Sequence, residues 1–331
     1  MSRSVLRLGT RRSTLATTQS GWVADLLRAR GHEVELVEIV TEGDVNHAPL
    51  TQIGGTGVFA SALRGALHSG EVDFAVHSLK DLPTQPEPGL VVAGIPERED
   101  VRDVLVADGH TLSTLPQGAR VGTGSPRRAA QLMCHRPDLA VRAIRGNVER
   151  RISFVRSGEL DAVVLAGAGI RRLGRTSDVA EFIDPAIMLP APGQGALAIE
   201  CRADAEVAEA IAELDDAVTR ACVTAERALL RALEAGCTAP IGALATLEGD
   251  ELVLEGFAGS DDGTIALRRS ARGALAEPEA LGAALATDLL DAGADGIAAS
   301  VLARSHERHA PPVAGGTNHD GPTAAVKEQK P

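Results

Sequence analysis

The sequence predicts an α/β fold, with two similar α/β domains followed by a smaller α+β domain that has a three-stranded antiparallel sheet. Strand-like and helix-like segments alternate from the N-terminus to about residue 165. A strand, a Gly-Thr turn and a helix start occur twice, at residues 7–13 and 120–128, which indicates a repeated domain. Three strand-like segments joined by short turns then follow one another, a pattern typical of an antiparallel sheet.

The first predicted domain begins as a β-α-β unit. Its expected elements are, in order, a strand at 5–8, a helix from about Ser13 to Arg30 that ends at Gly31, a strand at 34–40, a helix at about 59–68 and a buried strand at 72–76. Residues 41–57 contain glycine, proline and polar residues without periodicity. They therefore predict a long loop, of a length usually found in active-site lids.

The other two domains are predicted from the same patterns. The expected elements of the second domain are a strand from Arg120, a helix from Ser125, a strand at 141–144, a helix at 147–157 and a strand at 162–165. Those of the third are a helix at 219–235, strands at 241–247, 252–259 and 264–272, and a helix near 277–290. Beyond about Ser305 the chain is rich in His, Pro, Gly, Thr and Asn, a composition that predicts disorder.

The composition argues against several classes of protein. The net charge of −12 disfavours a general polyanion binder. Five Phe, one Trp and no Tyr supply too few aromatic rings for stacking on single-stranded nucleic acid. No apolar stretch is long enough for a signal peptide or a membrane span. We therefore expect a cytoplasmic protein that binds neither nucleic acid nor a membrane.

The cysteines and histidines show no metal-binding pattern, because Cys134, Cys201, Cys222 and Cys237 lack C-x-x-C spacing and no H-E-x-x-H occurs. We expect free thiols and no metal. The first three cysteines lie in apolar segments and are interpreted as core residues. Gly236 is interpreted as the residue that ends the preceding helix, which would expose Cys237 on the next loop. Both an inert and a reactive role stay open for that thiol.

Lys80 is the only lysine before residue 327, in a chain with 33 lysines and arginines. It lies in the segment His77-Ser78-Leu79-Lys80-Asp81-Leu82-Pro83, directly after a predicted buried strand. Ligand sites of open α/β sheets usually form at such strand ends. Because lysine is a compact point charge and arginine a larger planar fork, we interpret this position as a tight polar site. The alternative is a lysine left by chance in a solvated turn.

The middle of the chain is strongly basic. Residues 120–175 contain twelve arginines against four acids, a local excess of eight positive charges. Ser125 is expected to cap a helix whose first residue is Pro126, so that Arg127 and Arg128 lie beside free backbone N–H groups. Helix starts combined with arginine side chains are typical carboxylate or phosphate sites.

A second helix start of this kind is expected at Arg145-Gly146-Asn147, with Arg151 one turn further on. No nucleotide-binding motif accompanies these residues. The other arginines of this region are interpreted as solvated surface charges, namely Arg136, Arg142, Arg150, Arg156 and Arg175. The sequence therefore predicts a cleft between two α/β domains that holds a multiply anionic small molecule, with Lys80 and Asp81 at its edge.

Six motifs occur in a fixed order along the chain. They are T-R-x-S-x-L-A at 10–16, H-S-L-K-D-L-P at 77–83, R-G-N-V at 145–148, P-G-Q-G-A at 192–196, T-A-E-R at 224–227 and G-C-x-x-P-I-G at 236–242. With these motifs the chain resembles the hydroxymethylbilane synthase (porphobilinogen deaminase) family from about Leu6 to Arg304. The resemblance implies two lobes similar to periplasmic binding proteins and a third domain that carries a cofactor. The expected division is 1–98 with 195–217, then 99–194, then 218–305, and a disordered tail at 306–331.

The resemblance also implies an activity in tetrapyrrole biosynthesis. A dipyrromethane cofactor would be bound covalently to Cys237 through a thioether, and four porphobilinogen molecules would be added in turn to its free end. Hydrolysis would then release hydroxymethylbilane, with four ammonia formed in all. Asp81 would contact the pyrrole N–H groups, stabilise the cationic azafulvene formed as ammonia leaves and assist proton transfer. The partners would be porphobilinogen and the growing polypyrrole, and a monomer is expected.

Each ring bears an acetate and a propionate, and the resemblance assigns these carboxylates to polar side chains. For the cofactor they are Lys80, Ser125, Arg127 and Arg128, beside Asp81. For the substrate they are Arg11, Ser13, Thr123, Arg145, Arg151, Arg172 and Gln194. The chain departs from the family at Thr56 and Ser61, where many members have lysines, and at Gly124 and Pro126.

Two hypotheses from other classes stay open. One is a non-catalytic cytosolic anion-binding or sensor protein that keeps the two-lobed fold, and release of ammonia from porphobilinogen would distinguish the enzyme from it. The other is a nucleic-acid protein, which only the arginine density supports.

Overall fold

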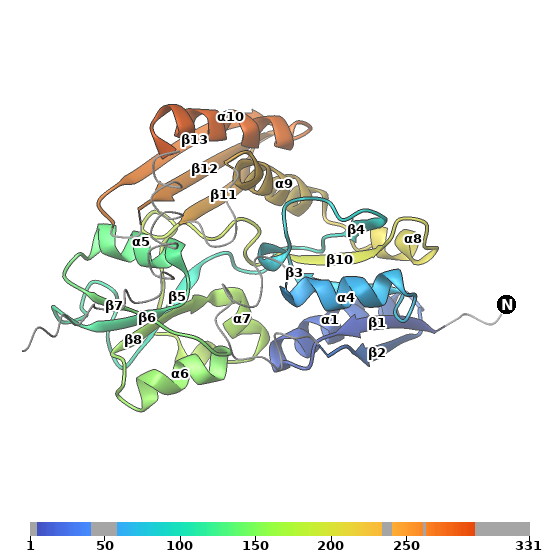
Figure 1. Ribbon diagram of the computed structural model, residues 1–331, viewed down its shortest axis with the longest axis horizontal. Coiled ribbons are helices and arrows are strands. Elements are labelled where there is room, and N and C mark those ends of the chain that lie inside the picture. The colour runs from blue at the N-terminus through green and yellow to red at the C-terminus, as the bar shows by residue number, and fades with distance from the viewer. Residues whose placement is uncertain (1–4, 41–57, 234–239, 261–262, 295–331) are drawn as a thin grey trace, which may run out of the picture.

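The computed structural model describes residues 5–40, 58–233, 240–260 and 263–294. Figure 1 shows two α/β lobes side by side, with a third domain that packs against both. Each of the three has its own sheet and its own hydrophobic core.

The first lobe contains a five-stranded sheet in the order β2-β1-β3-β10-β4. Its strands are β1 Leu6–Thr10, β2 Val34–Glu38, β3 Phe74–Ser78, β4 Leu90–Gly94 and β10 Leu197–Arg202. β1 pairs in parallel with β2 and β3, whereas β10 runs antiparallel between β3 and β4. A segment more than a hundred residues distant in the sequence therefore completes this sheet.

The helices of this lobe are α1 Thr14–Ala29, α4 Val58–His68 and α8 Val207–Ala212. Leu27 of α1 and Phe74 of β3 share one core cluster, while Leu63 of α4 and Ala75 belong to another. Successive residues of a strand point to opposite faces, so β3 is covered on both sides. This burial explains why β3 is apolar at consecutive positions.

The second lobe has a five-stranded sheet in the order β7-β6-β8-β5-β9. Its strands are β5 Asp103–Ala107, β6 Arg120–Thr123, β7 Ala140–Ala143, β8 Ala162–Ala166 and β9 Glu181–Phe182. Its helices are α5 Pro126–His135, α6 Val148–Arg156 and α7 Gly167–Arg172. β6 pairs in parallel with β7 and β8, whereas β5 is antiparallel to β8 and β9. A short 3-10 turn, Thr176–Asp178, precedes β9.

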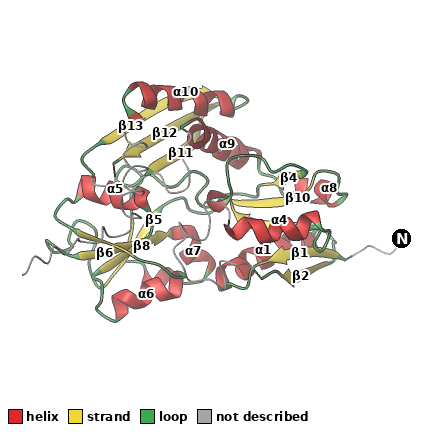
Figure 2. Cartoon of the chain, viewed as in Figure 1, coloured by secondary structure: helices red, strands yellow, loops and turns green. Residues whose placement is uncertain are grey.

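The third domain has the three-stranded antiparallel sheet β11-β12-β13, as predicted. Its strands are β11 Ile241–Glu248, β12 Glu251–Gly259 and β13 Ala266–Ala274, and its helices are α9 Ala217–Ala232 and α10 Pro278–Asp291. Both helices pack side by side on the sheet (Figure 2). Gly282 permits their close approach, because a Cβ there would overlap Ala225 O and Ala228 Cβ of α9.

Most predicted elements are confirmed, with ends displaced by a few residues. The sequence did not indicate β4, β5, β9, β10, α7 or α8. Each of these is short, and a short apolar run fits a strand or a helix segment equally well. The predicted loop at 41–57, the helix end at Gly236 and the tail after 305 lie outside the described residues.

The cysteine predictions have a mixed outcome. Cys201 and Cys222 are buried, as expected of core residues. Burial raises the pKa of each of these thiols to about 11. The prediction for Cys134 is wrong, because this residue is exposed near the end of α5 and its thiol donates to Gly263 O at 3.3 Å. A residue in an apolar helix segment can therefore still be exposed to solvent.

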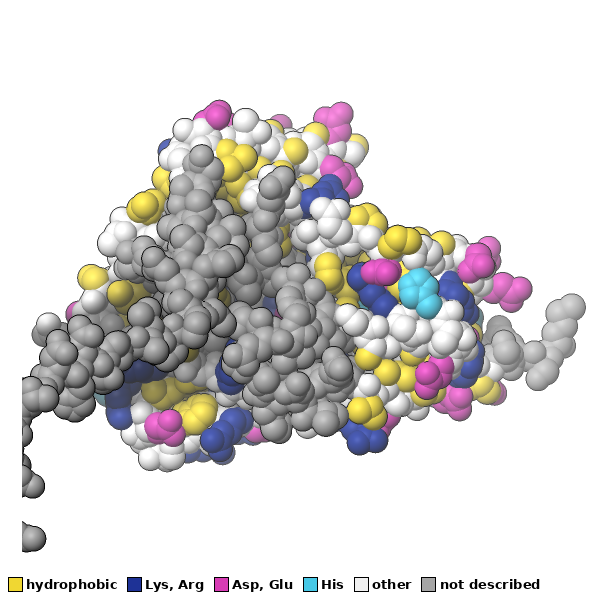
Figure 3. All heavy atoms as spheres, in the orientation of Figure 1, with side chains coloured by type: hydrophobic (Ala, Val, Ile, Leu, Met, Phe, Trp, Pro, Cys, Tyr) yellow, Lys and Arg dark blue, Asp and Glu magenta, His cyan; other side chains and the backbone are white. Residues whose placement is uncertain are grey.

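In the part of the chain that the structure describes, no helix combines the length and apolarity needed to cross a membrane. On the face seen in Figure 3, described acidic and basic side chains are interspersed over the two lobes and the third domain.

Candidate active site

The first lobe brings two motifs to one edge of its sheet. β1 and β3 are parallel neighbours, so the residues that follow them lie at the same end. Arg11 and Ser13 follow β1, and Lys80 and Asp81 follow β3. Ser13 caps α1 by accepting a hydrogen bond from Ala16 N at 3.3 Å. The two motifs are therefore neighbours in space although about seventy residues separate them in the sequence.

Lys80 and Asp81 belong to a single 3-10 turn, Leu79–Asp81. Leu79 is buried at 2% exposure, and its N–H donates to Ala196 O of the neighbouring segment at 3.1 Å. Lys80 is half-buried, whereas Asp81 is exposed. Burial lowers the pKa of Lys80 to about 8, although the nearby Asp81 carboxylate acts in the opposite direction. The turn thus holds a partly desolvated cation beside an accessible carboxylate.

The second lobe brings three strand ends together. β6 lies between β7 and β8, and all three are parallel, so the residues after them share one edge. Such a point, where connections leave a strand to opposite sides, is a usual ligand site. Thr123 ends β6, and its Oγ1 accepts from Ser125 N at 3.2 Å. Ser125 Oγ accepts from Arg128 N at 3.5 Å, so its predicted role as the cap of α5 is confirmed.

A buried acid, Asp103, pairs with both arginines of this helix start. It is fully buried, and it lies 2.8 Å from Arg127 Nη1 and 2.8 Å from Arg128 Nη2. Burial alone would raise the pKa of Asp103, but the two guanidinium groups hold it well below its usual range. Asp103 starts β5, which is antiparallel to β8, so it lies at the same edge as the ends of β6 and β8.

Gln194 connects the two lobes at this point. Its side chain is fully buried, and its Nε2 donates to Asp103 Oδ1 and to Val101 O, both at 2.8 Å. Its Oε1 accepts from Lys80 Nζ at 3.3 Å. Because Leu197 of β10 is paired with Ser78 of β3, Gln194 lies next to the Lys80 turn. One amide thus bridges the buried acid of the second lobe and the lysine of the first.

Arg151 and Arg172 are half-buried at the same edge. Burial lowers the pKa of Arg151, Arg128 acts in the same direction and Asp81 opposes them, so these groups lie within electrostatic range. Arg151 Nε donates to Gly146 O at 2.8 Å. Arg172 Nη2 donates to Gly195 O at 2.7 Å, next to Gln194. Arg145, by contrast, is exposed.

Little space is left for a side chain at position 124. A Cβ at this position would lie 2.7 Å from Ile144 O and 3.8 Å from Arg151 Nη2. A serine here would therefore press on the strand that leads to Arg145. The departure from the commoner family residue is consistent with the close approach of the two strand ends.

The charges at the site do not cancel. The interacting cations are Lys80, Arg127, Arg128, Arg145 and Arg151, and the anions are Asp81 and Asp103, which leaves an excess of three positive charges. Arg127 Nε is buried without an acceptor in the described part of the chain. Buried charge and unsatisfied donors are unfavourable unless a partner binds. The site therefore fits a ligand with several carboxylates.

Two family models match the chain. Residues 6–210 match "Porphobilinogen deaminase, dipyromethane cofactor binding domain" and residues 220–291 match "Porphobilinogen deaminase, C-terminal domain". The chain belongs to the porphobilinogen deaminase family. It is 57% identical to porphobilinogen deaminase 1 of Streptomyces coelicolor, over 90% of this chain and 98% of that one. It is 54% identical to the porphobilinogen deaminase of Thermobifida fusca, over 92% and 98% respectively.

The similarity to solved structures is weaker. A nutrient binding protein from Burkholderia cenocepacia bound to methionine covers 62% of this chain, and 89% of its own length is matched, with a TM-score of 0.39 and 15% identity. A periplasmic domain from Bordetella pertussis covers 63% of this chain, and 86% of its own length is matched, with a TM-score of 0.38 and 18% identity.

The T-A-E-R motif of this porphobilinogen deaminase family member attaches the third domain to the site. Glu226 of α9 is fully buried, and its carboxylate lies 2.7 Å from Arg98 Nη1. It also accepts from Gly193 N at 2.7 Å and from Ala245 N at 2.9 Å. Arg98 Nε in turn donates to Gln194 O at 2.7 Å. The residues around Gln194 are thus fixed to the third domain.

The predicted sorting of the arginines is correct in part. Arg142, Arg150 and Arg156 are exposed, as expected of surface charges. The interpretation of Arg136 is wrong, because it is half-buried and donates to Leu112 O at 2.6 Å and to Leu115 O at 2.9 Å. Arg175 is also half-buried, with its Nε 2.6 Å from Asp178. Both arginines stabilise loops of the second lobe rather than facing water.

Asp103 is the main residue that the sequence did not indicate. The sequence does place an acid at the start of the apolar run Asp103–Ala107. A buried carboxylate is unfavourable there unless a cation pairs with it, and this pattern could have indicated Asp103. Cys237, Thr56 and the glycine that precedes Cys237 lie outside the described residues.

Proposed function

We propose that this chain is a hydroxymethylbilane synthase, a transferase that joins four porphobilinogen molecules onto a covalent dipyrromethane with loss of ammonia and then releases hydroxymethylbilane by hydrolysis. The observation that carries the proposal is the excess of positive charge, part of it buried, where the strand ends of both lobes meet. A polymer of pyrroles that each bear two carboxylates matches this charge. The family match favours the enzyme over a sensor with the same two lobes.

The cofactor would be held by Cys237 and by the basic edge of the site. Bound there, dipyrromethane would supply the free pyrrole end to which substrate is added. Lys80 and Arg128 are placed to bind its carboxylates, because both border Asp103 and Gln194. Ser125 fixes the start of α5, where unpaired N–H groups favour anions.

Arg127 would act on the cofactor largely through its charge. It is only 2% exposed, and its Nη1 donates to Leu189 O while pairing with Asp103. Such a group contributes a strong field in a low-dielectric interior without direct access to solvent. The Arg127 charge also keeps Asp103 ionised, and the Asp103 carboxylate in turn orients Arg128.

The substrate carboxylates would be bound by side chains around this centre. We propose Arg11, Ser13, Thr123, Arg145, Arg151, Arg172 and Gln194 for this set. Arg151 and Arg172 are the best supported, because both are half-buried cations at the edge where Lys80 lies. The hydroxyl groups of Thr123 and Ser13 each accept a backbone hydrogen bond, which fixes their positions. Each can still donate its own O–H to a substrate carboxylate.

Asp81 is proposed as the catalytic residue. Its carboxylate is exposed beside Lys80 and lies within electrostatic range of Arg151. A fixed carboxylate can accept hydrogen bonds from pyrrole N–H groups and stabilise the positive charge that develops as ammonia leaves. It can also receive the proton lost from a pyrrole carbon.

Substitution of Asp81 tests this function. We expect Asp81→Asn and Asp81→Ala to abolish hydroxymethylbilane and ammonia formation while circular dichroism stays unchanged, and Asp81→Glu to keep a trace of activity. Asp161→Asn is the matched control, because Asp161 is a carboxylate that pairs with Arg120 before β8, at the opposite end of that strand. Near-normal product formation by Asp81→Ala would remove Asp81 from the mechanism.

We further infer a cytoplasmic monomer that needs neither nucleic acid nor a membrane. The net charge of −12 supports the first exclusion, since it repels polyanions. Sedimentation at micromolar concentration, with and without porphobilinogen, measures the oligomeric state directly.

A further inference from the structure

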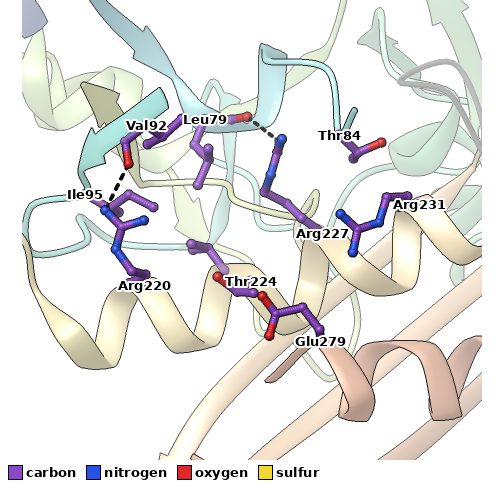
Figure 4. A pocket seen from close by; sticks show the side chains of 10 residues that line it. Leu79, Thr84, Val92, Ile95, Arg220, Thr224, Arg227, Arg231 and Glu279 are labelled. Atoms are coloured by element: carbon purple, nitrogen blue, oxygen red, sulfur yellow. Dashed lines mark hydrogen bonds between the residues drawn. The ribbon is translucent and has the colours of Figure 1, made fainter. Parts of the chain in front are cut away.

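Arg227 of the third domain contacts the turn that carries Lys80 and Asp81. Its Nη1 donates to Leu79 O at 3.1 Å and to Leu82 O at 2.9 Å, and its Nη2 donates to Pro83 O at 2.6 Å. Figure 4 shows the side chain directed from α9 toward the carbonyl of Leu79. One guanidinium group therefore binds backbone on both sides of the proposed catalytic residue.

The helix that bears Arg227 is rigidly placed. The preceding residue, Glu226, is fully buried and bonded to Arg98, to Gly193 N and to Ala245 N. The following residue, Ala228, is 4% exposed and packs close to Gly282 of α10. Since neither neighbour can move freely, the position of the guanidinium is set by the third domain.

Besides Arg227, backbone hydrogen bonds hold the turn. Leu79 N donates to Ala196 O, and Leu82 N donates back to Leu79 O, both at 3.1 Å. Asp81 lies between these two anchors and is exposed. The three carbonyls bound by Arg227 come from residues 79, 82 and 83. Loss of the guanidinium would therefore remove the hydrogen bonds to all three carbonyls, two of which follow Asp81 in the sequence.

A cavity borders the turn, and its described lining residues include none of the proposed carboxylate-binding residues. It has a volume of about 150 Å³ and is lined by Leu79, Thr84, Thr224, Arg227 and Arg231, among others (Figure 4). Arg231 lies one turn further along α9, is exposed and donates to none of these carbonyls. The cavity gives a small cation access to the place of the Arg227 side chain.

We propose that Arg227 is a positioning residue for the reaction. It acts through the carbonyls of residues 79, 82 and 83 and holds Lys80 and Asp81 in a fixed place relative to the domain whose sequence contains Cys237. The proposal rests on the function assigned above to Asp81. Its consequence is that the third domain sets the geometry of the proposed catalytic carboxylate as well as carrying the cofactor.

The test measures the rate of each porphobilinogen addition, by rapid quenching and intact-protein mass, in the cofactor-loaded fraction of Arg227→Ala. We expect a fall of about 10- to 100-fold per addition, because a displacement of about 1 Å at a reacting group can cost up to about 100-fold. Guanidinium chloride at millimolar concentration should restore part of the rate, whereas urea at the same concentration should not. A residue with only a structural role would lower loading or stability but not this rate.

Hydrogen exchange gives a second readout that is independent of activity. In Arg227→Ala, the amides of residues 79–82 and 84 should exchange faster than in the unaltered protein; Pro83 has no amide hydrogen. Arg231→Ala is the matched control, since it removes an arginine from the same helix and cavity, and it should change neither exchange nor rate. Arg227→Lys keeps the charge without the planar fork and should be intermediate. It also serves as the test variant if Arg227→Ala does not fold.

The outcomes separate this inference from the proposed function. If Asp81→Asn is fully active, the role of Asp81 fails whatever Arg227 does. If Asp81→Asn is inactive but the Arg227 variants add porphobilinogen at the normal rate, only the positioning role is overturned. A slow variant with unchanged exchange at 79–84 and no response to guanidinium also overturns it.

Discussion

Replacement of Asp103 by asparagine is the sharpest test of the buried charge cluster. The substitution keeps the shape of the side chain but removes its charge. Two guanidinium groups, at 2% and 5% exposure for Arg127 and Arg128, would then lose their shared carboxylate. Gln194 Nε2 would keep an oxygen acceptor, because an amide still offers one. The main cost is therefore the uncompensated buried charge.

The expected loss of stability follows from the burial of these charges. Breaking a buried ion pair by removing one partner costs about 3–5 kcal/mol in the free energy of unfolding. Domains of ordinary stability have only about 5–15 kcal/mol in total, so the loss is large. Urea denaturation followed by circular dichroism measures it. The loss should be smaller in the cofactor-loaded protein, because bound carboxylates replace part of the missing charge.

Glu248→Gln is the control. Its carboxylate lies 2.6 Å from Arg272 Nη2, but both side chains are 54% exposed. Exposed pairs contribute about 0–1 kcal/mol, so this change should have little effect. If Asp103→Asn is destabilised by no more than Glu248→Gln, the idea that Asp103 neutralises buried charge at the site is wrong.

Three further predictions concern the cofactor and the substrate. The mass of the purified active protein should exceed the mass of its sequence by one dipyrromethane. The Cys237→Ser variant should lack this added mass, and the Cys134→Ser variant should keep it. An unmodified mass in fully active protein would contradict the covalent mechanism. Arg151→Ala should lower kcat/KM for porphobilinogen far more than Arg156→Ala, because the Arg156 side chain is 63% exposed. Equal losses in the two variants would contradict the proposal that Arg151 binds a substrate carboxylate. Because burial lowers the pKa of Lys80 to about 8, its positive charge is lost as pH rises through that value, so cofactor loading should slow above about pH 8. Lys80→Met, which carries no charge at any pH, should load slowly throughout and show no such decline in a measurement of loading rate against pH.

Much of the local structure follows from the sequence alone. The alternation of strands and helices, the helix start at Ser13, the cap at Ser125 and the antiparallel sheet of the third domain were all predictable. These features depend on periodic burial and on hydrogen bonds between residues three or four positions apart. The position of Lys80 and Asp81 at a strand end was predictable for the same reason.

The contacts that turn these pieces into a site depended on the tertiary structure. Asp103 could not be identified as the partner of Arg127 and Arg128, because that pairing requires β5 to lie antiparallel beside β8. The bridge from Gln194 to Lys80 likewise requires β10 to pair with β3. Strand order and register are set by packing between segments far apart in the chain, which no local pattern records. Periodicity therefore identified which residues carry the charge, and only the pairing of distant strands decided which charges meet.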